Sequence, residues 1–218
     1  MIITIDGPAG AGKSTVARGL ASRLDFEFLD TGAMYRTVAW ACLDRGIDLS
    51  DRKAVAKTAK SLSLTFEGNC VFCDGKDVTK AIRTAESSET ASIVAAVPAV
   101  RSEMVRLQRE SAAGRNVVSE GRDQGTIVFP DADCKFFVTA NPNERAVRRH
   151  AELTSKGEDI SLDEVLRQIV DRDERDRTRA IAPLVVPENA IEVDTSGNGP
   201  DEVIGQLEVS AREKLGLG

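Results

Sequence analysis

Histidine, cysteine and aromatic residues are scarce in this sequence, and each shortage excludes a class of function. The 218 residues include one histidine, His150, four cysteines and 4% aromatic residues. A single histidine leaves no histidine-rich metal site and argues against a Ser-His-Asp triad. Four cysteines in a chain of this length do not form a disulfide scaffold. Platforms that stack the bases of single-stranded nucleic acid need more aromatic residues than this chain offers.

The chain also lacks an excess of positive charge. Its 29 Lys and Arg residues against 35 Asp and Glu residues give a net charge of −6, whereas general binders of nucleic acid or anionic membranes carry a basic excess. The uncharged run Thr90–Val100 is far shorter than the ~20 residues of a membrane span. Residues 1–6 lack the basic and long apolar regions of a signal peptide, so we expect none. We therefore expect a cytoplasmic protein with reduced thiols and with no nucleic-acid or membrane partner. We also expect a monomer, because the sequence shows no heptad run and no long apolar surface helix.

A length of 218 residues predicts one domain, or one domain with an insert. Residues 2–5 have the composition of a short buried strand, and residues 26–29 that of a second one. Between them, residues 13–24 predict a helix with Val16, Leu20 and Leu24 on one face. The order of strand, turn, helix and strand predicts a parallel α/β sheet. Further strands are expected at residues 116–119, 135–138 and 190–193, and further helices at residues 33–43, 52–62, 98–113, 145–153, 161–177 and 200–215.

The rhythm of strands and helices changes between about residues 61 and 100, where we expect an inserted part. Residues 63–66 alternate between polar and apolar, and the pairs Gly68-Asn69 and Asp74-Gly75 are typical of turns. These features predict a small antiparallel set of strands. Nearby, Cys70 and Cys73 would point to opposite faces of a strand, which disfavours a redox or zinc role. We expect Cys42, Cys134 and Trp40 to lie in the core and His150 on the surface.

Two segments carry signals for the start of a helix. Asn141 with Glu144, and Ser161 with Glu164, match the capping box, in which the two side chains satisfy each other's backbone N–H groups. The polar segment 154–160 between these two helices is a candidate mobile segment.

The most informative motif is a glycine-rich loop that follows the first expected strand and precedes the first expected helix. It fits the pattern G-x-x-x-x-G-K-S/T at every fixed position from Gly7 to Ser14. Its backbone N–H groups and the helix dipole would hold phosphate oxygens, Lys13 would contact the β- and γ-phosphates, and Ser14 would ligate Mg²⁺. The residues expected to bind ATP are Gly7, Pro8, Ala9, Gly10, Ala11, Gly12, Lys13, Ser14 and Thr15.

Switches, motors and kinases share this loop, so the loop alone leaves the reaction open. A GTPase switch needs the string N-K-x-D, and the nearest string here, residues 141–144, lacks the Lys. A motor ATPase usually has an apolar strand that ends in Asp-Glu, whereas here a single acid, Glu120, is followed by Gly121-Arg122-Asp123. Charged groups after a strand's carboxyl end face the crevice where α/β sheets bind ligands. This arrangement suits a second anionic substrate.

Arginines also gather near the end of the helix expected at residues 161–177. Arg172, Arg175, Asp176 and Arg179 have the spacing i, i+3, i+4 and i+7 of one helical stripe. Such a stripe is either a solvated face with an Arg172–Asp176 pair or the face of a closing lid. Beside a phosphate loop, guanidinium groups have a specific use, because they stabilise the charge that phosphoryl transfer spreads over the oxygens.

Four blocks of the sequence resemble the bacterial-type cytidylate kinases. They are residues 7–15, the block Leu29-Asp30-Thr31-Gly32-Ala33-Met34-Tyr35-Arg36, residues 120–131 and residues 172–184. The resemblance covers nearly the whole chain, including the insert that distinguishes this type from the shorter UMP/CMP kinases. Glu120 stands where Asp is also common and Thr31 where Ser is common, and residues between about 150 and 165 match weakly.

The resemblance implies a nucleoside monophosphate kinase with an α/β P-loop fold, which transfers the γ-phosphoryl group of ATP to CMP or dCMP with Mg²⁺. It implies a core of residues 1–30, 101–142 and 180–218, a monophosphate-binding part at residues 31–100 with the insert at about 61–100, and a lid at residues 143–179. It assigns Thr31, Tyr35 and Arg36 to the monophosphate pocket, Arg36, Arg122 and Arg179 to the acceptor phosphate, Arg172 and Asp176 to the sugar, and Ser92, Arg101 and Asp123 to the cytosine edge. The expected catalytic residues are Lys13, Arg122, Arg172, Arg175 and Arg179.

The assignment to the cytosine edge has a chemical logic. Cytosine presents the N4 amino donor beside the N3 acceptor, so Asp123 would accept from N4 while Arg101 would donate to N3 and O2, and uracil reverses both groups. Two rival hypotheses remain open. One is a kinase for UMP or a non-nucleotide acceptor, and the other is a nucleotide-binding regulatory protein that hydrolyses its nucleotide slowly.

Overall fold

The computed structural model describes residues 1–68, 70–155 and 157–217 and divides into two compact units. The phosphate-loop unit comprises Met1–Leu29 and Ala112–Gly218, and the middle unit comprises Asp30–Ser111. The division into core, monophosphate-binding part and lid stays a prediction of the sequence.

A five-stranded sheet organises the phosphate-loop unit, in the order β2-β6-β1-β7-β8. The central strand β1 (Ile2–Asp6) pairs in parallel with β6 (Val117–Gly121) and with β7 (Cys134–Thr139), and β7 pairs in parallel with β8 (Ile191–Asp194). The remaining strand is β2 (Glu27–Asp30). In this register Asp6 lies beside Gly121 on one side and Phe137 on the other. The predicted parallel α/β sheet is confirmed, and the carboxyl ends of β1 and β6 meet at one edge.

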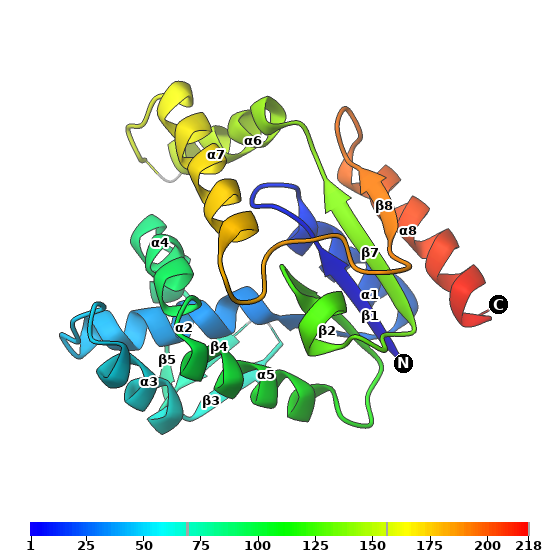
Figure 1. Ribbon diagram of the computed structural model, residues 1–218. Coiled ribbons are helices and arrows are strands. Elements are labelled where there is room, and N and C mark those ends of the chain that lie inside the picture. Colours follow the sequence, from blue (N-terminus) through cyan, green and yellow to red (C-terminus); the bar gives the residue numbers. More distant parts are fainter. Residues whose placement is uncertain (69, 156, 218) are drawn as a thin grey trace. The chain divides into compact units, whose positions relative to one another are not determined.

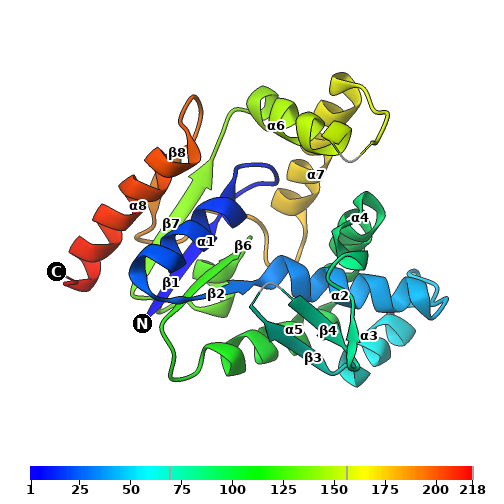
Figure 2. The same cartoon turned by 180° about the vertical axis from the view of Figure 1, so that it is seen from behind.

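Two helices pack on the sheet and close the main apolar core. They are α1 (Lys13–Leu24), which has the predicted bounds, and α8 (Pro200–Leu215), and Figure 2 shows both in front of the strands. The core is built from Ile5 of β1, Leu20 of α1 and Leu207 of α8, all fully buried. A Cβ at Gly19 would collide with Ile204, so this glycine allows α1 and α8 to approach each other closely.

Helices α6 (Pro142–Ser155) and α7 (Leu162–Thr178) follow β7 and pack against each other, as Figure 1 shows. They share a separate apolar cluster, formed by Ala146, Leu153, Val165 and Ile169. This pair of helices therefore has its own small core. Lys156, within the segment expected to be mobile, lies outside the described residues.

The two predicted capping boxes are each half wrong. Asn141 Oδ1 accepts from Asn143 N at 2.9 Å, but Glu144 Oε2 accepts from Gly197 N at 3.0 Å and does not reach back to the cap. Ser161 Oγ accepts from Glu164 N at 3.2 Å, and the Glu164 side chain pairs with neighbours on α7. The glutamate side chain that should accept from the N-cap backbone N–H instead binds Gly197 in the first case and Arg167 in the second.

The middle unit begins with α2 (Thr31–Asp44) and α3 (Arg52–Ser61) and continues into an antiparallel sheet in the order β3-β4-β5. The strands are β3 (Leu64–Glu67), β4 (Cys70–Cys73) and β5 (Lys76–Asp77), which confirms the predicted antiparallel set. Asn69 lies outside the described residues. A 3₁₀ turn (Ala81–Arg83), α4 (Ala85–Val94) and α5 (Pro98–Ala112) complete the unit, and α4 was not predicted.

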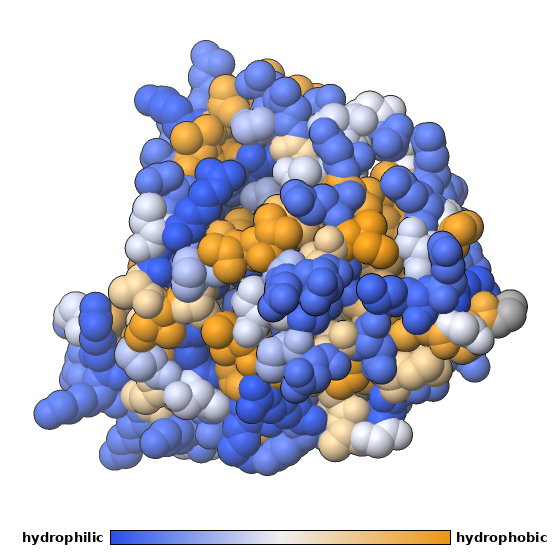
Figure 3. Space-filling view, turned by 45° about the vertical axis from the view of Figure 1, so that its right-hand side comes forward, coloured by the Kyte–Doolittle hydropathy of each residue, from blue (hydrophilic) through white to orange (hydrophobic). Residues whose placement is uncertain are grey.

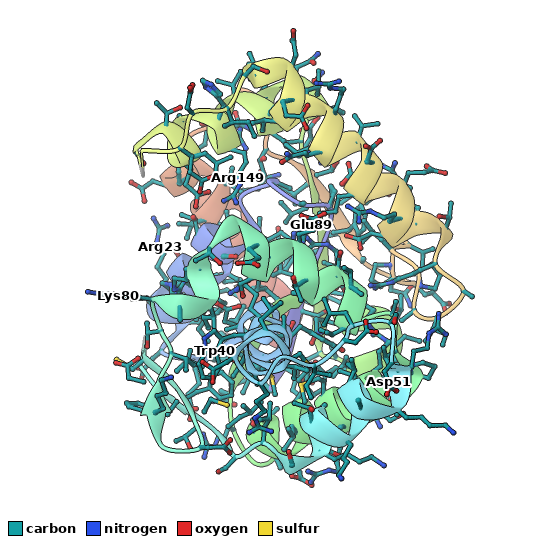
Figure 4. All side chains as sticks on the ribbon, turned by 90° about the vertical axis from the view of Figure 1, so that its left-hand side faces the viewer. Arg23, Trp40, Asp51, Lys80, Glu89 and Arg149 are labelled. Carbon is teal, nitrogen blue, oxygen red and sulfur yellow. The ribbon has the colours of Figure 1, made fainter. Side chains whose placement is uncertain are left out.

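Several residues interpreted as structural are placed largely as expected. Cys42, Cys73 and Cys134 are buried, whereas Cys70 is exposed, so the two cysteines of the C-x-x-C string do point to opposite faces. Trp40, on α2 in Figure 4, is half-buried and packs against the apolar cluster of the middle unit, and Lys76 Nζ lies 4.8 Å from its ring centroid. His150, expected on the surface, is partly exposed, and its Nε2 lies 3.0 Å from the Ile160 carbonyl oxygen.

The described helices include none that is both long enough and apolar enough to cross a membrane. On the face drawn in Figure 3, hydrophilic residues cover most of the area and hydrophobic ones form small patches. Exposed large hydrophobic residues are Met1, Leu43, Ile93, Ile127, Val147, Leu162, Val170, Ile181, Val185, Val186 and Val209.

Candidate nucleotide-binding site

The glycine-rich loop connects the end of β1 to the start of α1, as the sequence predicts. Gly7, Gly10 and Gly12 have φ of 149°, 75° and 79°, a region that residues with a side chain rarely adopt. A Cβ at Gly7 would collide with the backbone oxygen of Val138 in β7. The glycines therefore let the loop curl tightly against the sheet and place its N–H groups at the N-terminus of α1, a position suited to binding phosphate.

Lys13 is the first residue of α1 and is almost fully buried, with 5% of its surface exposed. Its Nζ donates to the Pro8 carbonyl at 2.7 Å, so the side chain folds back over the loop. Burial lowers the pKa of Lys13 to about 7, and the nearby Arg122 adds to this effect while Glu120 opposes it. A phosphate anion in the loop would favour the charged form of this ammonium group.

Ser14 and Glu120 bring two oxygen ligands together. Ser14 Oγ, on α1, donates to Glu120 Oε2 at 2.9 Å, and Glu120 is buried near the carboxyl end of β6. Oxygen ligands of this kind suit Mg²⁺, which is usually held by one or two protein groups together with phosphates. Among the residues that the structure describes, no cluster of three or more His, Cys, Asp or Glu residues could hold a metal. The donor set fits a magnesium ion shared with a nucleotide.

Asp6, which the sequence analysis missed, fixes the turn after β6. Its carboxylate is fully buried and accepts from Gln124 N at 2.8 Å and from Gly125 N at 2.7 Å. Burial raises the pKa of Asp6 to about 6, although the two N–H donors act against the rise. Arg122 and Asp123 immediately precede Gln124 in the chain. These two hydrogen bonds to Asp6 therefore also restrain the backbone that carries Arg122 and Asp123. The sequence did contain a signal for Asp6, because an acidic residue ends the apolar strand just before the phosphate loop.

Asp176 on α7 collects positive charge from two segments. Arg122 Nε donates to Asp176 Oδ2 at 3.0 Å, and Arg179 Nη1 lies 3.8 Å from Asp176 Oδ1. Burial alone would raise the pKa of Asp176, but Arg122, Arg172 and Arg179 outweigh it and hold the pKa below its usual value. The structure thus brings three of the predicted arginines together around the buried carboxylate of Asp176, itself a predicted site residue.

The predicted helical stripe needs two corrections. Arg175 is exposed, and its Nε donates to the Asp171 carbonyl of its own helix at 3.4 Å, away from the group around Asp176. Arg179 is not helical, because it caps the end of α7 with φ −59° and ψ 136°, and its Nε donates to the Ala182 carbonyl. The turn after α7 therefore aims Arg179 at Asp176, where i+3 spacing alone predicted a straight stripe.

In the middle unit the predicted residues lie on three helices. Thr31 is buried at the start of α2, and Arg36 on the same helix pairs with Asp30 at 3.3 Å. Arg101 of α5 is 5% exposed, and its guanidinium carbon lies 5.7 Å from the ring centroid of Tyr35. The structure therefore brings Tyr35 and Arg101 together within this unit. Ser92, on α4, donates through Oγ to the Glu89 carbonyl of its own helix at 2.8 Å.

The sequence model of one protein family, described as cytidylate kinase, matches residues 3–213. Among curated proteins, the chain is 44% identical over 207 residues to the cytidylate kinase of Clostridioides difficile, covering 95% of this chain and 96% of the relative. It is 48% identical over 210 residues to the cytidylate kinase of Pelotomaculum thermopropionicum, covering 94% and 93% of the two chains.

Solved structures share the fold at low sequence identity. An uncharacterized protein from Eubacterium ventriosum is 10% identical with a TM-score of 0.54, covering 97% of this chain and 98% of that one. A gluconokinase from Sinorhizobium meliloti is 15% identical with a TM-score of 0.51, covering 97% and 91%. At these identities the likeness supports the α/β fold alone.

Proposed function

The chain belongs to the cytidylate kinase family, and from this premise we propose that it transfers the γ-phosphoryl group of ATP to CMP or dCMP, giving ADP and CDP or dCDP. The observation that carries the proposal is the family match over residues 3–213, which extends far beyond the phosphate loop. The loop geometry supports it, because Lys13 and Ser14 stand at the N-terminus of α1 where phosphates bind. The enzyme is accordingly a nucleoside monophosphate kinase, a phosphotransferase.

On the ATP side, residues 7–15 would bind the triphosphate through backbone N–H groups and the Lys13 ammonium. Phosphoryl transfer needs little covalent chemistry from the protein, so positioning and electrostatic stabilisation account for most of the rate. Lys13 now donates to the Pro8 carbonyl at 2.7 Å, and its long side chain can exchange that carbonyl for a phosphate oxygen. The resulting contact would neutralise the negative charge on the transferring group.

Ser14 would hold the magnesium ion through its hydroxyl group, whose Oγ lies 2.9 Å from Glu120 Oε2. When bound, Mg²⁺ neutralises charge on the β- and γ-phosphates and orients them. The protein's own contribution is to hold the Ser14 hydroxyl in place, and the buried Glu120 carboxylate does this as hydrogen-bond acceptor.

On the acceptor side, we propose that the guanidinium groups of Arg36, Arg122 and Arg179 contact the monophosphate and that Thr31 and Tyr35 line its pocket. Arg122 and Arg179 are already oriented by Asp176. Because an arginine held by a buried carboxylate loses little further freedom on binding, it is pre-organised for a phosphate. Arg172 and Asp176 are proposed to meet the sugar, and a lid at residues 143–179 to close over the nucleotides.

For the base, we propose that Asp123 accepts from the cytosine N4 amino group and that Ser92 and Arg101 serve N3 and O2. Asp123 and Arg101 are both about 95% buried, at 4% and 5% exposure. Buried polar groups of this kind reject a base with the reversed donor pattern, because like groups would then face each other without hydrogen bonds. This would select cytosine over uracil.

A coupled assay that measures ADP release tests the proposal. With ATP and Mg²⁺, turnover should be fast with CMP and dCMP and much slower with UMP and AMP. Fast turnover of UMP or of a non-nucleotide acceptor alone would favour the first rival hypothesis. Slow hydrolysis of ATP with no acceptor preference would favour the regulatory protein.

Asp123→Asn tests the base assignment. The amide can present either a donor or an acceptor, so kcat/KM for CMP should fall and the CMP/UMP preference should narrow by about tenfold or more. Both substrates should be measured with wild type and variant. If kcat/KM fell equally for CMP and UMP, Asp123 would instead help to position the phosphate or Mg²⁺, and a role in recognising the base would be contradicted.

We also propose that the enzyme is a cytoplasmic monomer whose partners are its substrates. Size-exclusion chromatography with light scattering would test the monomer, since a stable dimer would elute at twice the mass of 23.4 kDa.

A further inference from the structure

Arg145 is the largest fully buried side chain of the chain's described part, with 2% exposure, although a guanidinium group is costly to bury. It lies on the first turns of α6 and donates to three different segments. Nε donates to the Ala140 carbonyl after β7 at 3.0 Å, Nη1 to the Ala9 carbonyl of the phosphate loop at 2.9 Å, and Nη2 pairs with Asp173 Oδ2 of α7 at 2.6 Å. The guanidinium group of Arg145 thus connects the segment after β7, the phosphate loop and helix α7.

The loop and α6 also touch through van der Waals packing at this point. A Cβ at Gly10 would lie 3.2 Å from Arg145 Cβ, which is tighter than ordinary contact. The absence of a side chain at Gly10 therefore lets the start of α6 rest against the loop. Arg145 therefore contacts the loop in two ways: its guanidinium group donates to the Ala9 carbonyl, and its backbone packs closely against Gly10.

Asp173 extends the connection along α7. It is 3% exposed, its Oδ2 pairs with Arg145, and its Oδ1 has no hydrogen-bond donor among the described residues. Arg172 precedes it, and Asp176, which orients Arg122 and Arg179, follows one turn later. The position of Asp173 therefore sets where these groups stand relative to the phosphate loop.

A role in stability alone explains this pair poorly. Helices α6 and α7 have their own apolar cluster, which already holds them to each other. Replacing a buried ion pair by apolar residues of similar volume is often neutral or stabilising. What apolar residues could not supply is a donor for the Ala9 carbonyl together with a fixed point for α7.

Resting on the proposed function, we infer that Arg145 and Asp173 are positioning residues for phosphoryl transfer. Arg145 fixes the Ala9 carbonyl and so the shape of the loop, and through Asp173 it ties α7 and its arginines to the same loop. Neither residue touches the reacting atoms. They align the cations of α7 with the γ-phosphoryl group that the loop binds.

The first test compares two acid-to-amide changes in ion pairs of α6 and α7. Asp173→Asn should lower kcat about tenfold or more, because misplacement of catalytic groups by about 1 Å can cost a hundredfold, while KM for ATP changes less than kcat. The matched control is Glu152→Gln, which breaks the exposed pair with Arg149 on α6, labelled in Figure 4, and should leave kcat unchanged. If kcat of Asp173→Asn equals that of the control, the inference is wrong.

The second test separates positioning from stability. In Arg145→Met with Asp173→Leu, both buried charges are gone, so the melting temperature should return toward that of wild type. Because the Ala9 carbonyl and α7 have lost their common donor, kcat should stay at least as low as in Asp173→Asn. Recovery of kcat together with the melting temperature would overturn the inference. Should the double variant not fold, the result of Asp173→Asn decides.

A third measurement is independent of the acceptor. Hydrogen exchange of the backbone amides should rise in residues 7–12 and in the second half of α7 for Asp173→Asn, and not for Glu152→Gln. Unchanged exchange would overturn the inference even if CMP is phosphorylated. A wild type that does not phosphorylate CMP would instead contradict the proposed function, and the exchange data would still judge the coupling of loop and helix.

Discussion

Charged side chains are used differently around the phosphate loop and around the three-stranded sheet of the middle unit. Near the loop they are buried: Asp6, Lys13 and Asp176 are 0%, 5% and 5% exposed. Around the small sheet the core is apolar, with Val71 and Ile82 among its members, and the ion pairs lie outside it. The side chains of the Arg45–Asp74 pair, for example, are 38% and 42% exposed.

This difference indicates which charges act in chemistry. Burying a charge costs several kcal/mol unless partners compensate it, so a fold that retains buried charges at one place keeps them for something other than stability. An exposed pair costs little to form and contributes ~1 kcal/mol or less. The comparison therefore predicts large effects on activity near the loop and small effects on both activity and stability near the sheet.

The largest effect should come from removing the buried cation of the loop. Lys13→Ala should lower kcat by about a thousandfold, because loss of a preorganised charge at the transition state typically costs a hundred- to a thousandfold, while the fold is retained. Lys53→Ala, on the exposed side of α3, is the control and should leave kcat unchanged. A folded Lys13→Ala that keeps more than a tenth of the activity would contradict the role of the loop.

The next effect concerns Asp6 and is measured as the change of the free energy of unfolding with pH. Its folded pKa of about 6 lies above the ordinary 3.8, so between these values the folded state binds more protons than the unfolded state. The contribution of Asp6 is thus fully present below pH 4 and is lost as the pH rises through 6, by about 3 kcal/mol at 1.4 kcal/mol per pKa unit. Urea unfolding of wild type and Asp6→Asn from pH 4 to 7 should show this slope only in wild type.

An exposed carboxylate of the small sheet provides the opposite sign. Hydrogen bonds from Thr79 hold the pKa of Asp77 below its usual value, so its contribution is present above pH 4 and lost as the pH falls. Asp77→Asn should therefore remove a weak rise of stability with pH. If the free energy of unfolding changed with pH equally in Asp6→Asn and Asp77→Asn, the contrast between the two regions would be contradicted.

The sequence predicted the parts whose signals are local. The loop from Gly7 to Ser14 and the helix Lys13–Leu24 follow from glycine spacing and apolar periodicity, and both are confirmed. Helix Ala85–Val94 was missed because its residues show almost no apolar stripe. The order of strands in the sheet, with β1 at its centre, has no local signal at all.

The site was predicted less completely, for a physical reason. Arg145 and Asp6 act through partners that lie more than a hundred residues away along the chain, Ala9 and Gln124 respectively. No spacing rule connects such positions. Arg175 was included because helical spacing places it beside Asp176, but the structure shows it exposed, and only the turn after α7 determines that Arg179 reaches the carboxylate instead.

The different positions of Arg175 and Arg179 predict different effects on activity. Arg179→Ala should lower kcat/KM for CMP by about tenfold or more, since it removes a guanidinium group aimed by Asp176, with little change in melting temperature. Arg175→Ala, three residues earlier and exposed, is the matched control and should change kcat/KM by less than about twofold. Equal kinetics for the two variants would return the arginines of α7 to a solvated face.

The smallest effect should come from the exposed pair of the small sheet. Arg45 Nη2 lies 2.7 Å from Asp74 Oδ2, and its Nη1 donates to Ser61 Oγ at 3.2 Å, so the geometry is good. Solvent nevertheless screens the charges, and Arg45→Gln should lower the free energy of unfolding by no more than about 1 kcal/mol, and by less at high salt. Its kcat should equal that of wild type, because the side chains that Arg45 contacts, Asp74 and Ser61, are exposed. A loss of activity with unchanged stability would show that charges near the small sheet also serve the reaction, and the contrast between the two regions would fail.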